Sequence, residues 1–293
     1  MAEEEKRGAD QQIKVFYPLG HYYSPVVDTR ELAREPARSR VWPKLPHPTP
    51  GIDWRGDQQV ELCRNVLARQ ALFHFPSEPT SDPHEYYSNQ DVFPILDAYI
   101  LQAMLSHLKP RRMIEVGSGL SSLITARANR ELLRGRMVFT CIEPYPPPYL
   151  IDGIPGISDV RNEKIQDTPL ELFDQLGEND VLFIDTSHTV KTGGDVLWIY
   201  HQVIPRLRPG VVVHMHDAFL PGEYPPAWVL EGWGWNEAYL IQSFLAFNSA
   251  FEVLLGVRWL VLNHPTLLKD AFPMLSPVQA QNGASLWIRR VAA

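Results

Sequence analysis

Cysteine is scarce in this chain, and so are long apolar stretches and runs of basic residues. Only Cys63 and Cys141 occur, far apart and without the spacing of metal ligands, which argues against a disulfide framework or a cysteine-based zinc site. The apolar run at residues 251–262 contains Arg258 and is too short to cross a bilayer. Lys and Arg are scattered and the formal net charge is -7, so no nucleic-acid or anionic-membrane surface is predicted.

These absences predict a globular protein whose partners are small molecules or other proteins. Hydrophobic residues make up 45% of the 293 residues, which is ample for a packed core. The first seven residues, MAEEEKR, are acidic and polar, whereas a secretory signal needs a basic start and an apolar segment. With so few cysteines, a reducing cytoplasmic setting is expected.

The chain divides into three parts by pattern. Residues 1–12 are polar and without periodicity, and we expect a disordered tail. Residues 13–108 contain a proline-interrupted stretch and two segments with helical spacing, 51–73 and 93–108; we expect extended chain and helices that form a lid on the substrate side. Residues 109–293 alternate short apolar segments with helices and form the predicted ligand-binding domain.

In that domain the alternation predicts a doubly wound α/β fold. Strands are predicted at 112–116, 137–142, 160–165, 180–184, 210–215, 251–255 and 285–290. Helices are predicted at 121–133, 169–176, 194–206 and 235–247. Continuous apolar strands separated by helices indicate a seven-stranded, mostly parallel sheet covered on both faces.

The most informative segment is Glu115-Val116-Gly117-Ser118-Gly119, between the first of these strands and a helix. Glycine lets a ligand approach the main chain, and the helix start offers unpaired N–H groups, so the segment predicts a cradle for a nucleotide-like cofactor. The dinucleotide fingerprint also begins with two glycines one residue apart, but Ser122 stands at its third small position.

Polar residues recur where the predicted strands end, and in an open parallel sheet these ends lie along one edge, where ligands bind. The strand ends carry Glu115, Glu143, Gln166-Asp167, Asp185 with His188, and His216-Asp217. A carboxylate at any one of them is equally well explained as a cap on the next helix. Recurrence after five successive strands favours a ligand. Glu143 follows Gly119 at close to the roughly 20-residue spacing expected of an acid that binds ribose hydroxyls.

This ordered set resembles the class I S-adenosylmethionine-dependent methyltransferases, in particular their small-molecule branch. Residues 115–119 resemble the first motif of that family, Glu143 its ribose-binding acid, Gln166-Asp167 its adenine-contacting pair, and Asp185 the acid that ends its fourth strand. Residues 284–288 resemble its last, antiparallel strand. The resemblance covers roughly residues 90 to 290 and implies the strand order 3-2-1-4-5-7-6 and a Rossmann-like fold. The segments HYYSP at 21–25 and YYSN at 86–89 resemble a bacterial subgroup.

The resemblance implies S-adenosylmethionine as cofactor and in-line methyl transfer to a small molecule. The reaction expected is O-methylation of a natural-product-like compound in secondary metabolism. N- or C-methylation, a nicotinamide-dependent oxidoreductase and a non-catalytic cofactor-binding protein are the alternatives. The cofactor-binding residues implied are Glu115, Gly117, Ser118, Gly119, Ser121, Ser122, Glu143, Gln166, Asp167 and Asp185.

The catalytic residues expected are His188, Asp185 and His216, because a neutral imidazole near pH 7 suits removal of a proton from the acceptor. We prefer His188 as the base; a histidine that merely anchors its loop is the alternative. Some relatives hold Mg²⁺ at positions that match Asp185, His216 and Asp217. Since Mg²⁺ prefers oxygen ligands and His216 replaces a carboxylate, a required metal is not favoured.

Aromatic residues are dense between the fifth and sixth predicted strands. Trp233 and Trp235 lie in a glycine-punctuated loop and, with Tyr22, Tyr23 and Tyr87, are candidates for the roof of a substrate pocket. Core packing and a homodimer contact are the alternative interpretations of this aromatic segment.

Overall fold

The computed structural model describes residues 14–45 and 48–292. The chain forms two compact units, Met1–Leu45 with Tyr224–Gly234, and Pro46–Glu223 with Trp235–Ala293. The predicted tail, residues 1–12, lies outside the described residues. The predicted lid, residues 13–108, is divided between the two units.

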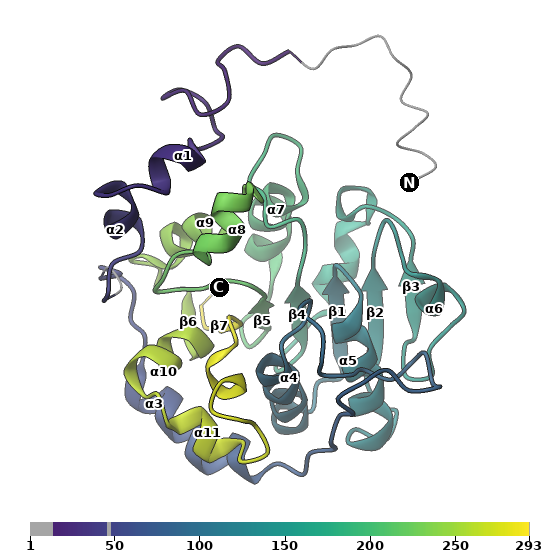
Figure 1. The fold of residues 1–293 in the computed structure, drawn as a ribbon. Helices are drawn as coiled ribbons and strands as arrows, with labels where there is room; N and C mark the ends of the chain where they lie inside the picture. Colours follow the sequence, from purple (N-terminus) through teal and green to yellow (C-terminus); the bar gives the residue numbers. More distant parts are fainter. Residues whose placement is uncertain (1–13, 46–47, 293) are drawn as a thin grey trace. The chain divides into compact units, whose positions relative to one another are not determined.

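The larger unit is built on one seven-stranded sheet (Figure 1). Its strands are β1 (Arg112–Val116), β2 (Val138–Ile142), β3 (Asp159–Arg161), β4 (Val181–Ile184), β5 (Val212–Met215), β6 (Phe251–Gly256) and β7 (Leu286–Arg290). They lie in the order β3-β2-β1-β4-β5-β7-β6. Strand β7 runs antiparallel to β5 and β6, and the other pairs are parallel. The predicted fold class and strand order are confirmed.

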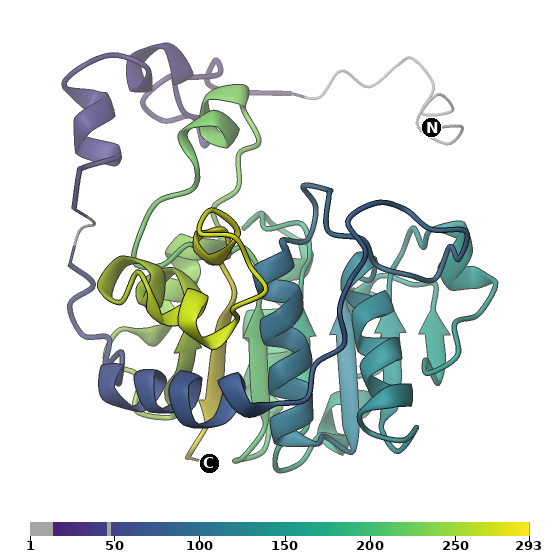
Figure 2. The same ribbon diagram turned by 60° about the horizontal axis from the view of Figure 1, so that its bottom comes forward.

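Helices cover both faces of this sheet because side chains of each strand alternate between two cores. In β1, Met113 packs into one core and Ile114 into the other. Against the first core pack α4 (Ile95–Leu108), α5 (Leu120–Glu131), α10 (Val257–Asn263) and α11 (Leu267–Ala271). Figure 2 shows α4 and α5 side by side across that face. Against the second core pack 3₁₀ helix Leu170–Gln175, the helical run from α7 (Asp195–Trp198) through Arg206, and α9 (Glu237–Leu245).

Helix α4 is apolar on nearly all sides, which suits a helix enclosed between the sheet and its neighbours. It ends at Leu108, and Lys109 follows as a cap in the left-handed conformation just before Pro110, where a helix cannot readily continue. Upstream, α3 (Gly56–Glu61) continues as a π-helical turn through Val66 and a 3₁₀ turn through Arg69. This unit also contains the short helix α6 (Pro148–Ile151) and a 3₁₀ turn at Gln279–Gln281.

The structure differs from the sequence-based expectation in three places. The strand predicted at 160–165 ends at Arg161, and Gln166 and Asp167 lie in a separate 3₁₀ turn, Ile165–Asp167. The helix predicted at 169–176 is a 3₁₀ helix. Helices α10 and α11 were not predicted, because the apolar run that begins in β6 continues without a polar break into α10 at Gly256.

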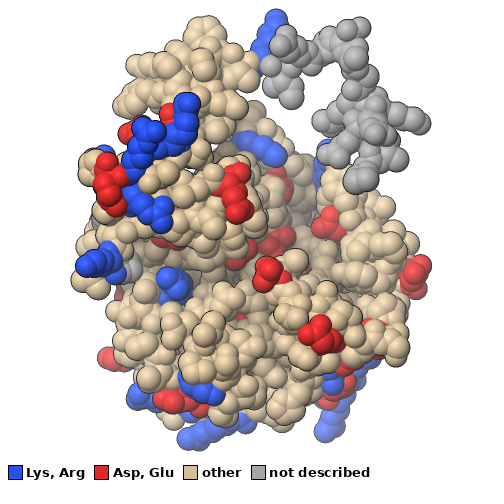
Figure 3. Space-filling model, in the orientation of Figure 1, with Lys and Arg blue, Asp and Glu red and all other residues tan. Residues whose placement is uncertain are grey.

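The smaller unit contains α1 (Thr29–Leu32), α2 (Ala37–Val41) and α8 (Pro226–Glu231). The Trp42 indole donates to the Tyr224 carbonyl at 2.9 Å, and this bond joins its two chain segments. Basic side chains gather over α1 and α2, among them Arg30, Arg38 and Arg40 (Figure 3). In the described part of the chain, no helix has the length and apolar character that a bilayer crossing requires.

Candidate functional site

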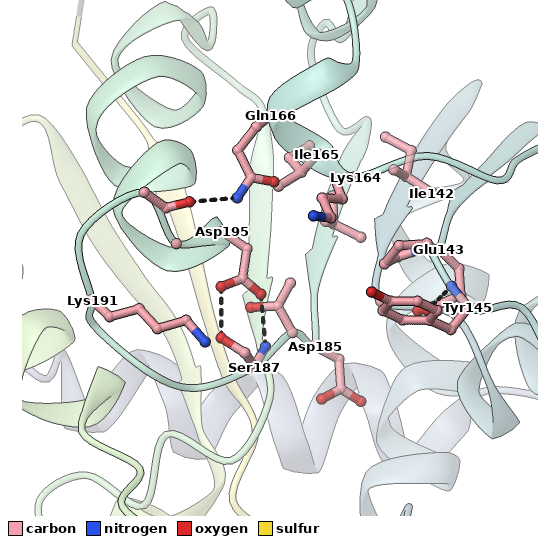
Figure 4. A pocket seen from close by; sticks show the side chains of 16 residues that line it. Ile142, Glu143, Tyr145, Lys164, Ile165, Gln166, Asp185, Ser187, Lys191 and Asp195 are labelled. Atoms are coloured by element: carbon pink, nitrogen blue, oxygen red, sulfur yellow. Dashed lines mark hydrogen bonds between the residues drawn. The ribbon is translucent and has the colours of Figure 1, made fainter. Parts of the chain in front are cut away.

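A cavity of about 500 Å³ lies in the larger unit where β1, β2 and β4 end (Figure 4). This is the edge at which open parallel sheets bind ligands. Its walls come from the segments that follow these strands and β3. The lining residues with the clearest chemical roles are Gly117, Glu143, Tyr145, Lys164, Gln166, Asp185, Lys191 and Asp195.

The floor of the cavity is the glycine turn. Gly117 has φ +83°, and a Cβ placed there would lie 1.6 Å from the carbonyl oxygen of Asp185. Only glycine therefore lets the end of β1 approach the end of β4 so closely. Helix α5 starts directly afterwards, and the Gly119 amide donates to the Ser122 hydroxyl at 3.1 Å. Ser122 thus serves as part of a helix cap at the position where a dinucleotide fingerprint has a small residue.

Glu115 lies beneath this turn and is fully buried. The hydroxyl of Ser121 donates to one of its carboxyl oxygens, and that of Ser122 donates to the other at 2.9 Å. Burial raises the pKa of Glu115 to about 8, although the serine hydrogen bonds act in the opposite direction. The carboxyl therefore supports the turn from below and does not line the cavity.

Glu143 stands on the cavity wall, at the end of β2. Its carboxylate accepts hydrogen bonds from the backbone amides of Ser118, at 3.2 Å, and Tyr145, at 2.8 Å. The first of these bonds ties the glycine turn to the next strand. The second is visible in Figure 4. The carboxylate is therefore fixed in place with acceptor capacity remaining for a ligand.

The opposite wall is a loop that runs from the end of β4 to α7. The Gln166 side-chain amide donates to the Gly193 carbonyl at 2.9 Å, and Asp195 accepts from the amide and the hydroxyl of Ser187 at 2.9 and 2.6 Å (Figure 4). Asp167 is exposed and does not line the cavity. Within the predicted pair, only Gln166 faces the ligand site.

At the end of β4 the cavity meets a buried charged group. His188 is held between two carboxylates: its Nε2 lies 3.1 Å from Asp185 Oδ1, and its Nδ1 lies 3.0 Å from Glu237 Oε2. Burial alone would lower the pKa of His188, but hydrogen bonds and charges from Asp185 and Glu237 raise it to about 10. His188 is thus an imidazolium at neutral pH. The expectation of a neutral His188 base does not fit this geometry, because both ring nitrogens are engaged and the ring carries its proton.

His216, at the end of β5, is the second histidine of this edge. Its ring stacks on Phe93 at 4.6 Å, and its Nε2 is 3.8 Å from Asp217 Oδ1. Among the described residues, neither ring nitrogen has a hydrogen-bond partner. Burial lowers the pKa of His216, but the charges of Asp185, Asp217 and Asp97 outweigh this and raise it. The orphaned nitrogens distinguish this imidazole from His188.

Comparison with known proteins addresses the same part of the chain. A family model described as a methyltransferase domain matches residues 114–218, from β1 to just beyond β5. An uncharacterized protein of Archaeoglobus fulgidus is 32% identical over 174 residues, 58% of this chain and 78% of that protein. The matched family model spans the glycine turn, Glu143 and Asp185, on a sheet with the expected strand order. The chain therefore contains a methyltransferase domain, on the seven-stranded fold expected of class I S-adenosylmethionine-dependent enzymes.

Solved structures similar to this methyltransferase include two described as O-methyltransferases. One, from Bacillus cereus and in complex with SAH, is 15% identical, covers 81% of this chain and 91% of its own, and has a TM-score of 0.40. The other, a putative O-methyltransferase from Klebsiella pneumoniae, is 13% identical over 81% of this chain and 89% of its own, with a TM-score of 0.38.

The metal site of some class I methyltransferases is not formed by the matching residues. Asp185 is hydrogen-bonded to His188, while His216 Nε2 lies 3.8 Å from Asp217 Oδ1. Over residues 14–45 and 48–292, no three His, Cys, Asp or Glu side chains are grouped so that they could hold a metal ion. The donor set, with an imidazole in place of a carboxylate, also fits Mg²⁺ poorly.

The predicted substrate residues fall into both units. Trp235 packs on His188 with ring centroids 4.3 Å apart, and Tyr87 is half-buried in the same unit. Tyr22, Tyr23 and Trp233 belong to the smaller unit and are exposed. In that unit Trp233 stacks on Trp228, with centroids 4.5 Å apart.

Sequence reasoning missed Lys164, Lys191, Asp195 and Glu237. Lys164 lies two positions before Gln166, so the sequence pattern could have predicted that it lines the cavity. The role of Glu237 could not be predicted in this way, because it lies 49 positions from His188, on the separate helix α9.

Proposed function

We propose that this methyltransferase methylates an oxygen atom of a small, natural-product-like molecule, with S-adenosylmethionine in the cavity at the ends of β1, β2 and β4. The observation that carries the proposal is the convergence of Gly117, Glu143, Gln166 and Asp185 on one cavity of about 500 Å³. That volume suits a ligand of nucleoside size. When bound, the cofactor supplies an electrophilic methyl group on a sulfonium.

The proposed roles follow from where each residue stands. Glu143 accepts hydrogen bonds from the ribose hydroxyls, because its carboxylate is already oriented by two backbone amides. Gln166 lies beside the adenine, with its amide fixed on Gly193. Gly117 and Gly119 leave the main chain open to the methionine portion, and the amides at the start of α5 bind its carboxylate. Ser118, Ser121, Ser122 and Glu115 support this turn from below or from its backbone.

Where the methyl group is transferred, near the ends of β4 and β5, the chain has to position the acceptor and take up its proton. Asp185 is the acid that lies both on the cavity wall and against His188. We assign the proton to His216 rather than His188, because neither ring nitrogen of His216 makes a hydrogen bond among the described residues, and its nearest carboxylate, Asp217, lies 3.8 Å from Nε2. His188 then serves to hold Asp185. Asp167, exposed beside Gln166, contacts the adenine amino group only if the turn 165–167 moves.

The test is transfer of an isotopically labelled methyl group from S-adenosylmethionine to a panel of phenols, alcohols and amines, with the product identified by mass spectrometry and NMR. Label on oxygen supports the proposal, whereas label on nitrogen or carbon only would contradict the acceptor assignment.

With the acceptor that reacts fastest, we expect His216→Asn to lower kcat about 100-fold, the usual contribution of a general base. Affinity for S-adenosylhomocysteine should stay unchanged. Equal kcat values would remove His216 from the proton path.

The setting proposed for this reaction is secondary metabolism in the cytoplasm. The two cysteines, Cys63 and Cys141, are buried free thiols, which suits a reducing compartment. No nucleic-acid or membrane partner is proposed.

A homodimer is compatible with the exposed aromatic residues of the smaller unit. Size-exclusion chromatography with light scattering would test it, and a monomer at all concentrations would contradict it.

A further inference from the structure

Glu237 makes contacts that the proposed reaction does not yet use. It is the first residue of α9, and its carboxylate and the His188 ring are both almost fully buried, at 2% and 4% exposure. Glu237 Oε2 lies 3.0 Å from His188 Nδ1, while Asp185 Oδ1 lies 3.1 Å from the other ring nitrogen. A ring held by carboxylates at both nitrogens is fixed in one orientation.

The backbone at the start of α9 holds the same residue. The amides of Asn236 and Glu237 both donate to the His188 carbonyl, at 2.9 and 3.1 Å, and the Val190 amide donates to Asn236 Oδ1 at 2.5 Å. The Trp235 ring covers the imidazole. His188 has φ +52°, a left-handed conformation that an L residue keeps only when its surroundings impose it. Residues 235–237 therefore act together as a clamp on His188.

The clamped loop continues into the wall of the cofactor cavity. Asp185 at its start, and Lys191, Gly193 and Asp195 further along, all line that cavity. The loop is fixed near its end by the Gln166 amide on Gly193. The clamp fixes the middle of the same loop, at His188. Loosening it should therefore disturb both the orientation of Asp185 and the cavity wall.

We propose that Glu237 is a positioning residue for methyl transfer, which holds His188 against Asp185 and so keeps residues 185–195 in the conformation that closes one wall of the cofactor cavity. The inference rests on the proposed place of S-adenosylmethionine in that cavity. The competing explanation is local: a carboxylate in the first turn of a helix stabilises that helix through its dipole, whatever else it touches.

Two matched substitutions separate these roles. Glu237→Asp keeps the charge at the start of α9 but shortens the side chain, so that it no longer reaches His188 Nδ1. Glu237→Gln keeps the length and an acceptor oxygen but removes the charge. We expect Glu237→Asp to weaken binding of S-adenosylhomocysteine, measured by calorimetry, about tenfold and Glu237→Gln about threefold, since the loop must then be ordered on binding. A purely helix-stabilising role predicts the reverse order. Glu61→Gln, an exposed residue at the end of α3, is the control.

A second readout needs no cofactor. In a ¹H–¹⁵N spectrum of the imidazole groups, the proton between His188 Nδ1 and Glu237 should give a downfield, exchange-protected signal, assigned by its loss in His188→Gln. The proposal predicts that Glu237→Asp abolishes this signal and Glu237→Gln retains it with a shift. If Glu237→Asp does not fold, Glu237→Gln in the His188→Gln background replaces it, and should cost no further affinity.

The outcomes are distinguishable. Retention of both the signal and the affinity in Glu237→Asp would overturn the positioning role. Additive losses in the double variant would overturn it as well, because Glu237 would then act without His188. If the wild-type chain binds no S-adenosylhomocysteine, the proposed cofactor site fails, while the imidazole signal still decides whether the clamp exists.

Discussion

Gly117→Ala is expected to destabilise the chain by at least about 3 kcal/mol and to abolish cofactor binding. The Cβ would lie 1.6 Å from the Asp185 carbonyl oxygen, so the ends of β1 and β4 would have to separate. An L residue at φ +83° is strained in addition. The floor of the cavity and the position of Asp185 would change together. Urea unfolding followed by circular dichroism measures the first effect, and calorimetry with S-adenosylhomocysteine the second.

Gly153→Ala is the matched control for this experiment. Gly153 has φ +89°, but a Cβ there would meet nothing within 4 Å. Gly153→Ala should lower the free energy of unfolding only by the conformational penalty, about 1–2 kcal/mol, and leave cofactor affinity unchanged. If both substitutions had the same cost, the close approach of Gly117 to Asp185 would not be a determinant of the fold.

Replacement of Glu115 by glutamine should remove much of the pH dependence of stability between about pH 5 and pH 8.5. Burial raises the pKa of Glu115 from 4.5 to about 8. The folded chain therefore keeps a proton that the unfolded chain releases. The resulting stability is fully present below the unfolded pKa and is lost as the pH rises through the folded one. The loss is on the order of a few kcal/mol.

The neutral amide of Glu115→Gln has no such proton to lose. We therefore expect the variant to be more stable than wild type at pH 8.5, and the difference between the two free energies of unfolding to shrink as the pH falls toward 5. Taking the difference cancels the titration of groups common to both chains. The measurement is urea unfolding at a series of pH values. A difference that stays constant from pH 5 to 8.5 would show that Glu115 keeps its ordinary pKa in the folded chain.

Much of the cavity at the ends of β1 and β2 was predictable from sequence, because its determinants are local. Gly117 and Glu143 each follow a short apolar strand directly, and a strand end fixes the place of the next residue in an open sheet. Glu115 was expected among the cofactor-binding residues, and the structure buries it completely. Its alternation along β1 turns it into the core, where the hydroxyls of Ser121 and Ser122 donate to its carboxyl oxygens.

The chemistry around His188, at the end of β4, was less predictable because it depends on residues far away in the sequence. His188 was expected to be neutral from its own identity and position. The carboxylate of Glu237, contributed by α9, and that of Asp185 together turn it into a cation. Similarly, Gln166 and Asp167 were expected directly after a strand, but β3 ends at Arg161 and a 3₁₀ turn places only Gln166 on the cavity. Periodicity reports neither strand length nor partners across the fold.

The central claim, that S-adenosylmethionine occupies the cavity with its ribose on Glu143, is tested most directly by titrating S-adenosylhomocysteine into the wild-type chain and into Glu143→Ala. We predict one site in wild type and an affinity about 100-fold lower in the variant, since two hydrogen bonds to a carboxylate are lost. Asp152→Ala, an exposed acid just after α6, should bind as wild type does. Equal affinities of wild type and Glu143→Ala, or binding of NAD in place of S-adenosylhomocysteine, would contradict the claim.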